Sequence, residues 1–151
     1  MNQETKYSKD NPSAPVEVCA AVIRQGSRTL ICGRAKTSPL YGYWEFPGGK
    51  VEKGETFAQC IQREIWEELG MKILPLDTVW VLEHCYPDKK VRVRFIRCIP
   101  APDSPPPQAR DQQDFKWIES GKLNQERMLP ADTPFAEFLV KSEKFRISCN
   151  K

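Results

Sequence analysis

The chain has 151 residues, of which 40% are hydrophobic and 28% are charged, a balance typical of one folded domain. Lysine and arginine number 23 against 20 aspartate and glutamate, so the net charge of +3 is too small to single out nucleic acid or a membrane as partner. No apolar run approaches the roughly 20 residues of a membrane span, and the polar residues 1–15 have no signal-peptide core, so we expect a cytoplasmic protein that does not bind a membrane.

The first half of the chain opens with two predicted strands. Residues 1–15 are expected to form a flexible tail, since they are polar and contain two prolines. The apolar segments Val16–Ile23 and Thr29–Cys32 flank a turn and predict a hairpin. Residues 33–50 are rich in glycine, proline and aromatic residues without a period, which predicts a loop whose length indicates a function.

One helix and a second hairpin are predicted next. Thr56 and Gln59 form a capping-box pattern, and Gly70 is the residue type best suited to end a helix. The segments Val79–Cys85 and Val91–Ile99 predict two strands, because the second alternates apolar residues with arginines.

The last third predicts a connection, a strand and a helix. The proline-rich residues 100–108 cannot continue a sheet and predict a surface connection. Residues 115–118 predict a short strand, and all the elements together indicate one mixed domain over residues 16–147. A final helix opening at Thr133 is expected to place four apolar residues on one side: Phe135, Phe138, Leu139 and Phe145.

The cysteines predict reduced structural thiols. They are widely spaced, and zinc ligands usually come in close pairs, so disulfides and a zinc site are disfavoured. Most lie within apolar runs, where cysteine behaves as a small hydrophobic residue, and a reducing cytoplasm fits them best. The six residues are Cys19, Cys32, Cys60, Cys85, Cys98 and Cys149.

Three carboxylates gather on one face of the predicted helix. Glu64, Glu67 and Glu68 are related by three and four positions, so their side chains share one arc. Like charges at these spacings destabilise a helix by about 0.2–0.5 kcal/mol per pair, which favours a cation against them. Oxygen ligands suit Mg²⁺, with Mn²⁺ as a substitute, and Mg²⁺ commonly bridges to substrate phosphates. The alternative is a solvated acidic face with Arg63 in ordinary surface ion pairs.

The spacing from Gly49 to Met71, G-x5-E-x7-R-E-[apolar]-x-E-E-x-G-[apolar], resembles the Nudix box at every defined position. The segment WEFPGGKVEKGET resembles the MutT-like branch of that family in particular. The resemblance implies an α+β protein with the Nudix fold, an α/β/α sandwich around a mixed β-sheet. It also implies Mg²⁺-dependent hydrolysis of a nucleoside triphosphate to the monophosphate and diphosphate, with oxidised dGTP as one candidate substrate.

The resemblance also assigns residue roles. The metal ligands would be the Gly48 carbonyl and the carboxylates of Glu64, Glu67 and Glu68, with Glu64 or Glu67 doubling as base. Arg63 would hold a carboxylate or meet phosphate, and Gly49 and Glu55 would support the site. The substrate would contact Arg34, Glu45, Phe46, Pro47, Gly48, Lys50 and Asp132.

Two positions depart from the branch's pattern. A further catalytic Glu can precede the late strand, and here Asp111 falls there, with Asp114 as a neighbour that would substitute for it. At the base-contacting position the branch has an amide, whereas this chain has Asp132. An ionised Asp accepts hydrogen bonds only, which suits the cytosine amine or an N–H edge of guanine or oxidised guanine. The alternative is that Asp132 caps the last helix.

Three functions remain open. A nucleotide-pool enzyme leads, with a CTP or dCTP pyrophosphohydrolase as its alternative. An RNA 5′-pyrophosphohydrolase is motivated by the basic residues Arg92, Arg94 and Arg97. A Nudix module that binds nucleotide without cleaving it is disfavoured by the intact carboxylates. No stable nucleic-acid complex is expected, and the protein would be a monomer or a homodimer.

Overall fold

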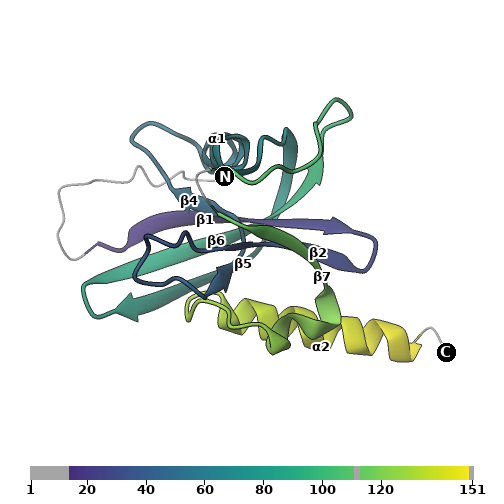
Figure 1. Cartoon of the computed structure of the whole chain (residues 1–151). Helices are drawn as coiled ribbons and strands as arrows, with labels where there is room; N and C mark the ends of the chain where they lie inside the picture. The colour runs from purple at the N-terminus through teal and green to yellow at the C-terminus, as the bar shows by residue number, and fades with distance from the viewer. Residues whose placement is uncertain (1–13, 111–112, 150–151) are drawn as a thin grey trace, which may run out of the picture.

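The computed structural model describes residues 14–110 and 113–149, and the side chains of residues 145–149 are outside that description. A mixed sheet carries α1 on one face and α2 on the other (Figure 1). The tail predicted over residues 1–15 lies outside the described residues apart from its last two positions. Within the described ranges, no helix is long and apolar enough to cross a membrane.

Seven strands form the sheet over the described residues, in the order β3-β2-β1-β6-β5, with β4 paired to β1 and β7 paired to β2. Only β1 and β6 run parallel, and the other pairs are antiparallel. The strands are β1 (Val16–Gln25), β2 (Arg28–Gly33), β3 (Trp44–Glu45), β4 (Gly48–Lys50), β5 (Ile73–Tyr86), β6 (Lys89–Pro100) and β7 (Phe115–Glu119).

The structure corrects two predicted boundaries. The segment 33–50, predicted as a loop, contains β3 and β4, which have two and three residues and are too short to show a period. Strand β5 begins at Ile73 instead of Val79, because Pro75 is tolerated at the sheet edge, where the register with β6 shifts. Of the residues 100–108 predicted as a connection, Pro100 is the last residue of β6, where it pairs with Ile73, and residues 101–108 lie outside every strand.

Helix α1 (Phe57–Leu69) has the ends that its sequence predicts. Thr56 Oγ1 accepts a hydrogen bond from the Gln59 amide at 3.1 Å, and Gln59 Oε1 accepts one from the Thr56 amide at 3.0 Å. Gly70 ends the helix at φ 63°, a left-handed conformation that glycine adopts without a Cβ clash. Ile61, Ile65 and Leu69 are buried against the sheet. The glutamates occupy the neighbouring arc of the helix.

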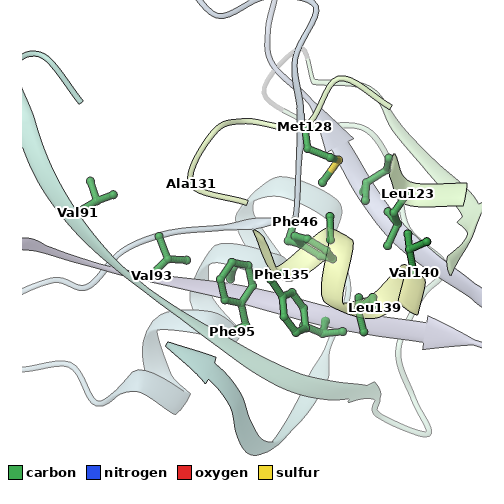
Figure 2. Close-up of a cluster of buried hydrophobic side chains, with 14 residues drawn as sticks. Phe46, Val91, Val93, Phe95, Leu123, Met128, Ala131, Phe135, Leu139 and Val140 are labelled. Carbon is green, nitrogen blue, oxygen red and sulfur yellow. The ribbon is translucent and has the colours of Figure 1, made fainter. Parts of the chain in front are cut away.

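One hydrophobic core lies between the sheet and α1, and a second lies between the sheet and α2 (Thr133–Cys149). The short 3₁₀ segment η1 (Ser120–Gln125) lies beside the second core. Three phenylalanines meet there (Figure 2): the Phe135 ring lies 4.5 Å from Phe95 and 5.4 Å from Phe46. Phe138 is 43% exposed, so the predicted apolar side of this helix is narrower than its sequence suggests. The Phe145 side chain lies outside the described residues.

The cysteines in the described residues are free thiols, as predicted. Four of them are buried and one, Cys85, is exposed. The Cys149 side chain lies outside the described part of the chain.

Candidate active site

Two glycines bring the β4 segment into contact with α1 and β1. A Cβ added to Gly49 would overlap the Glu64 carboxylate, and one added to Gly48 would overlap the Cys19 carbonyl. The two glycines pair with Cys19 and Ala20 of β1, which fixes their backbone in the middle of the sheet. Glycine is therefore required here for close approach, and the Glu64 carboxylate lies directly against the backbone of residue 49.

Arg63 is the centre of a network of carboxylates. It binds Glu55 in a bidentate pair, with Nε to Oε2 at 2.7 Å and Nη2 to Oε1 at 2.9 Å. Its Nη1 donates to Glu64 at 2.8 Å and to Glu67 at 3.3 Å, and its Nη2 donates to the Lys50 carbonyl at 3.1 Å. These charge-assisted bonds lower the pKa of Glu55 and hold the Glu64 side chain in one orientation.

Glu68 is the most deeply buried of the three helix carboxylates. Burial, with smaller contributions from the nearby Glu45 and Glu64 carboxylates, raises the pKa of Glu68 to about 9. The Gly48 amide donates a hydrogen bond to this carboxylate, yet its Oε2 atom is buried without a hydrogen-bond partner. Burial also raises the pKa of Glu64, against the opposing effect of Arg63. Buried, mutually repelling carboxylates with an unsatisfied oxygen are an environment that a cation would stabilise.

A second cluster of polar side chains, Arg34, Glu45 and Asp132, lies between Glu68 and the start of α2. Arg34 Nη1 donates to Glu45 Oε1 at 3.1 Å, while Arg34 Nε is buried without a partner. The Asp132 side chain is buried, and its Oδ2 accepts a hydrogen bond from the Phe46 amide at 2.9 Å. Burial raises the pKa of Asp132 well above its ordinary value, and Glu45 adds to that effect. The predicted substrate residues Arg34, Glu45 and Asp132 are thus neighbours in space.

The comparison with known proteins agrees with the motif. A NUDIX domain model matches residues 14–139. The chain belongs to the NUDIX domain family. The CTP pyrophosphohydrolase of Escherichia coli strain K12 is 32% identical over 123 residues, 81% of this chain and 89% of that protein.

Two further comparisons place the chain among MutT-like proteins. A Mycobacterium tuberculosis protein named putative 8-oxo-dGTP diphosphatase 2 is 32% identical over 121 residues, 76% of this chain and 81% of that protein. The solution structure of the MutT protein of methicillin-resistant Staphylococcus aureus 252 has a TM-score of 0.67 and 29% identity, and the match covers 86% of this chain and 98% of that one. The predicted α+β Nudix fold and the MutT-like resemblance are confirmed.

NUDIX hydrolases use divalent cations, and the residues of this NUDIX domain fit one by their chemistry. The donors are oxygens, and Glu68 offers one that has no other partner. Over the described residues, however, no three acidic, histidine or cysteine side chains are close enough together to form a coordination shell. Glu64 and Glu67 instead accept hydrogen bonds from Arg63 Nη1.

The other predicted site residues have differing surroundings in this NUDIX domain. The Phe46 ring belongs to the core and Pro47 is fully buried, so both would meet a ligand through their backbone only. The Lys50 side chain is exposed. Asp111 lies outside the described residues, and the Asp114 carbonyl accepts a hydrogen bond from the Gly33 amide at 2.8 Å.

The arginines that motivated an RNA substrate do not form one strip. Val93 and Phe95 face α2 while Ile96 and Cys98 face α1, so strand alternation places Arg97 on the opposite face from Arg92 and Arg94. Their charges also have partners on the protein. Arg92 bonds Glu17 and Glu83, both at 2.7 Å, Arg97 bonds Asp77 at 2.8 Å, and the Arg94 guanidinium lies 4.1 Å from the Phe57 ring centre.

Two residues near the site make contacts that no sequence spacing predicts. Tyr86 accepts a hydrogen bond from the Ala131 amide at 3.2 Å, which helps to fix the segment that contains Asp132. Arg110 Nη1 donates to the Trp66 carbonyl on α1 at 3.1 Å, across 44 positions of sequence. Neither contact is local, so no spacing rule identifies these residues.

Proposed function

We propose that this protein is a metal-dependent hydrolase of nucleoside triphosphates that releases the nucleoside monophosphate and diphosphate. The observation that carries the proposal is the Glu68 carboxylate, buried beside Glu45 and Glu64 with one oxygen unpartnered, within the helix of a matched NUDIX domain. The names of the M. tuberculosis and E. coli relatives support nucleotides as substrates. Residues 16–147 would act as one domain, as a monomer or homodimer without a stable nucleic-acid complex.

We propose Mg²⁺ as the cation, with Mn²⁺ as a substitute. Glu64, Glu67, Glu68 and the Gly48 carbonyl would hold it, because hard cations prefer oxygen ligands and Mg²⁺ bridges to phosphates. When bound, the ion neutralises charge on the phosphoryl oxygens and lowers the pKa of a water molecule. Glu64 and Glu67 accept hydrogen bonds from Arg63, so the cation would share these carboxylates with the guanidinium.

The chain's own residues then divide the remaining work. Glu64 or Glu67 would take the proton of the attacking water, since a carboxylate within hydrogen-bond reach is a general base. Arg63, fixed by its bidentate pair with Glu55, would hold the Glu64 and Glu67 side chains in position. Asp111 stays a predicted helper of this step.

Asp132 would contact the base. Its Oδ2 accepts a hydrogen bond from the Phe46 amide at 2.9 Å. The Asp132 carbonyl also accepts the Ala136 amide at the start of α2, so the helix-cap alternative stays open. A carboxylate beside the Arg34–Glu45 pair accepts hydrogen bonds from an exocyclic amine or a ring N–H. This chemistry suits cytosine nucleotides and guanine or oxidised guanine nucleotides, the two classes that the relatives' names mention.

The test is diphosphate release with Mg²⁺ across the common (d)NTPs, 8-oxo-dGTP, ADP-ribose and a triphosphorylated RNA oligonucleotide. We expect turnover of 8-oxo-dGTP or of cytosine nucleotides and little of the RNA. Glu67→Gln should lower kcat by about 10²-fold or more, because it removes a ligand or base but keeps the size of the side chain. The matched control is Glu137→Gln, at an exposed glutamate of α2, which should leave kcat unchanged.

Two results would contradict the proposal. Turnover of the RNA alone would mean that free nucleotides are not the substrate. Equal kcat for Glu67→Gln and the wild type would remove the acidic face from the reaction.

A further inference from the structure

The last turn of α1 carries a charge arrangement that is unfavourable on its own. Glu67 and Glu68 lie next to the C-terminus of the helix, and the last turn contains no basic residue. The C-terminal end of a helix has unpaired carbonyls and a partial negative charge, so carboxylates there are destabilising. Something outside the helix must therefore hold this turn in place.

That role falls to the segment 108–110, from a distant part of the chain. The Gln108 amide donates to the Leu69 carbonyl at 2.8 Å, and the Arg110 amide donates to the Glu68 carbonyl at 3.0 Å. The Arg110 side chain adds a third bond, from Nη1 to the Trp66 carbonyl at 3.1 Å. Three of the last four helix carbonyls thus receive donors from this segment.

Two further contacts fix the Arg110 guanidinium in its place. It lies 5.1 Å from the centre of the Trp66 ring, within the range of a cation–π interaction. A Cβ on Gly70 would come within 2.8 Å of the guanidinium, so the glycine that ends the helix also leaves the space that Arg110 fills. The guanidinium supplies at the helix end the positive charge that the last turn of α1 does not contain.

We propose that Arg110 is a positioning residue that holds the C-terminal turn of α1, and with it the carboxylates of Glu67 and Glu68, in the orientation that metal binding requires. The inference rests on the proposed function only for the use of these carboxylates. The hydrogen bonds of Arg110 to this turn go to the backbone carbonyls of Trp66 and Glu68, so it acts through the backbone.

The experiment compares Arg110→Ala, Arg110→Lys and the wild type by three measurements. They are Mn²⁺ affinity without nucleotide, by electron paramagnetic resonance; amide hydrogen exchange of residues 66–70 in metal-free protein; and kcat and KM with Mg²⁺. The matched control is Lys72→Ala, which removes an exposed ion pair with Asp103 on the same connection.

For Arg110→Ala we expect Mn²⁺ affinity and kcat to fall about tenfold, exchange of the turn to accelerate, and KM for the nucleotide to stay unchanged. Arg110→Lys should recover part of each loss, because an ammonium retains the charge and one donor for the Trp66 carbonyl. Lys72→Ala should match the wild type in all three measurements.

A lowered unfolding temperature of Arg110→Ala with unchanged Mn²⁺ affinity and kcat would overturn the proposal, since Arg110 would then be a purely structural cap. Equal exchange rates in Arg110→Ala and the wild type would overturn it as well. A wild type that binds Mn²⁺ but hydrolyses no nucleotide would refute the proposed function instead, and the binding and exchange measurements would still decide the role of Arg110.

Discussion

Glu68→Gln is expected to stabilise the metal-free protein while it removes activity. The glutamate is held in a buried site beside Glu45 and Glu64, with one oxygen unpartnered. Glutamine has the same shape and its carbonyl oxygen still accepts the Gly48 hydrogen bond, but it has no charge to bury. The substitution therefore separates the cost of the charge from the packing of the side chain.

The sign and size follow from the raised pKa of Glu68. A pKa of about 9 in the folded state against an ordinary 4.5 means that the folded protein binds this proton more tightly than the unfolded chain. The contribution of this bound proton to the free energy of unfolding is therefore complete below pH 4.5 and is lost as the pH rises towards 9. At about 1.4 kcal/mol per pH unit, the free energy of unfolding of the wild type falls by at most about 3 kcal/mol between pH 4.5 and 7. The variant has no such charge to bury, so its free energy of unfolding does not fall in this way.

The assay is urea unfolding in EDTA at pH 5, 7 and 9, followed by fluorescence. The two proteins should be equally stable near pH 5, and the advantage of Glu68→Gln should grow with pH. Adding Mg²⁺ should reverse the order, because only the wild type gains binding free energy. The matched control is Glu67→Gln, whose side chain is 52% exposed and whose effect should stay below about 0.5 kcal/mol. A variant less stable than the wild type at pH 7 would refute the reasoning.

Two further predictions concern α2 and the base contact. Phe135→Ala should lower the free energy of unfolding by about 3–5 kcal/mol in urea titrations, because the ring is buried against Phe46 and Phe95. Phe138→Ala, at an exposed position, should lower it by less than about 1.5 kcal/mol. Asp132→Ala should change the ratio of kcat/KM between cytosine and 8-oxoguanine nucleotides more than it changes the rate on a poor substrate, and an equal loss on all bases would limit Asp132 to holding the Phe46 amide.

Local chemistry allowed much of the acidic helix to be predicted. The bounds of α1 follow from Thr56, Gln59 and Gly70, whose side chains and conformation act within a few residues of one another. The shared face of the glutamates follows from helical geometry alone. That these carboxylates lie in a partly buried site could not be read in the same way, because their burial depends on β4 and on Arg34 and Glu45.

Contacts between distant residues account for what the sequence did not reveal. Asp132 was open to interpretation as a helix cap, because its bond to the Phe46 amide joins residues 86 positions apart. Strands β3 and β4 are held by β2 and β1 and contain too few residues for a pattern. Arg63 was expected to hold a carboxylate or meet phosphate, and only the folded chain shows how many carboxylates it gathers.

The parallel pairing of β1 with β6 has a consequence for how the protein acquires its activity during synthesis. Val16 pairs with Val91 and Ile23 with Cys98, so β1 gains this neighbour only after two thirds of the chain has been made. Gly49, which approaches Glu64, pairs with Cys19 on the other edge of the same strand. A nascent chain that ends before β6 therefore has the whole acidic helix, but β1 lacks its parallel neighbour in the sheet beneath that helix. Such non-local pairing makes folding slow compared with helical proteins of this size.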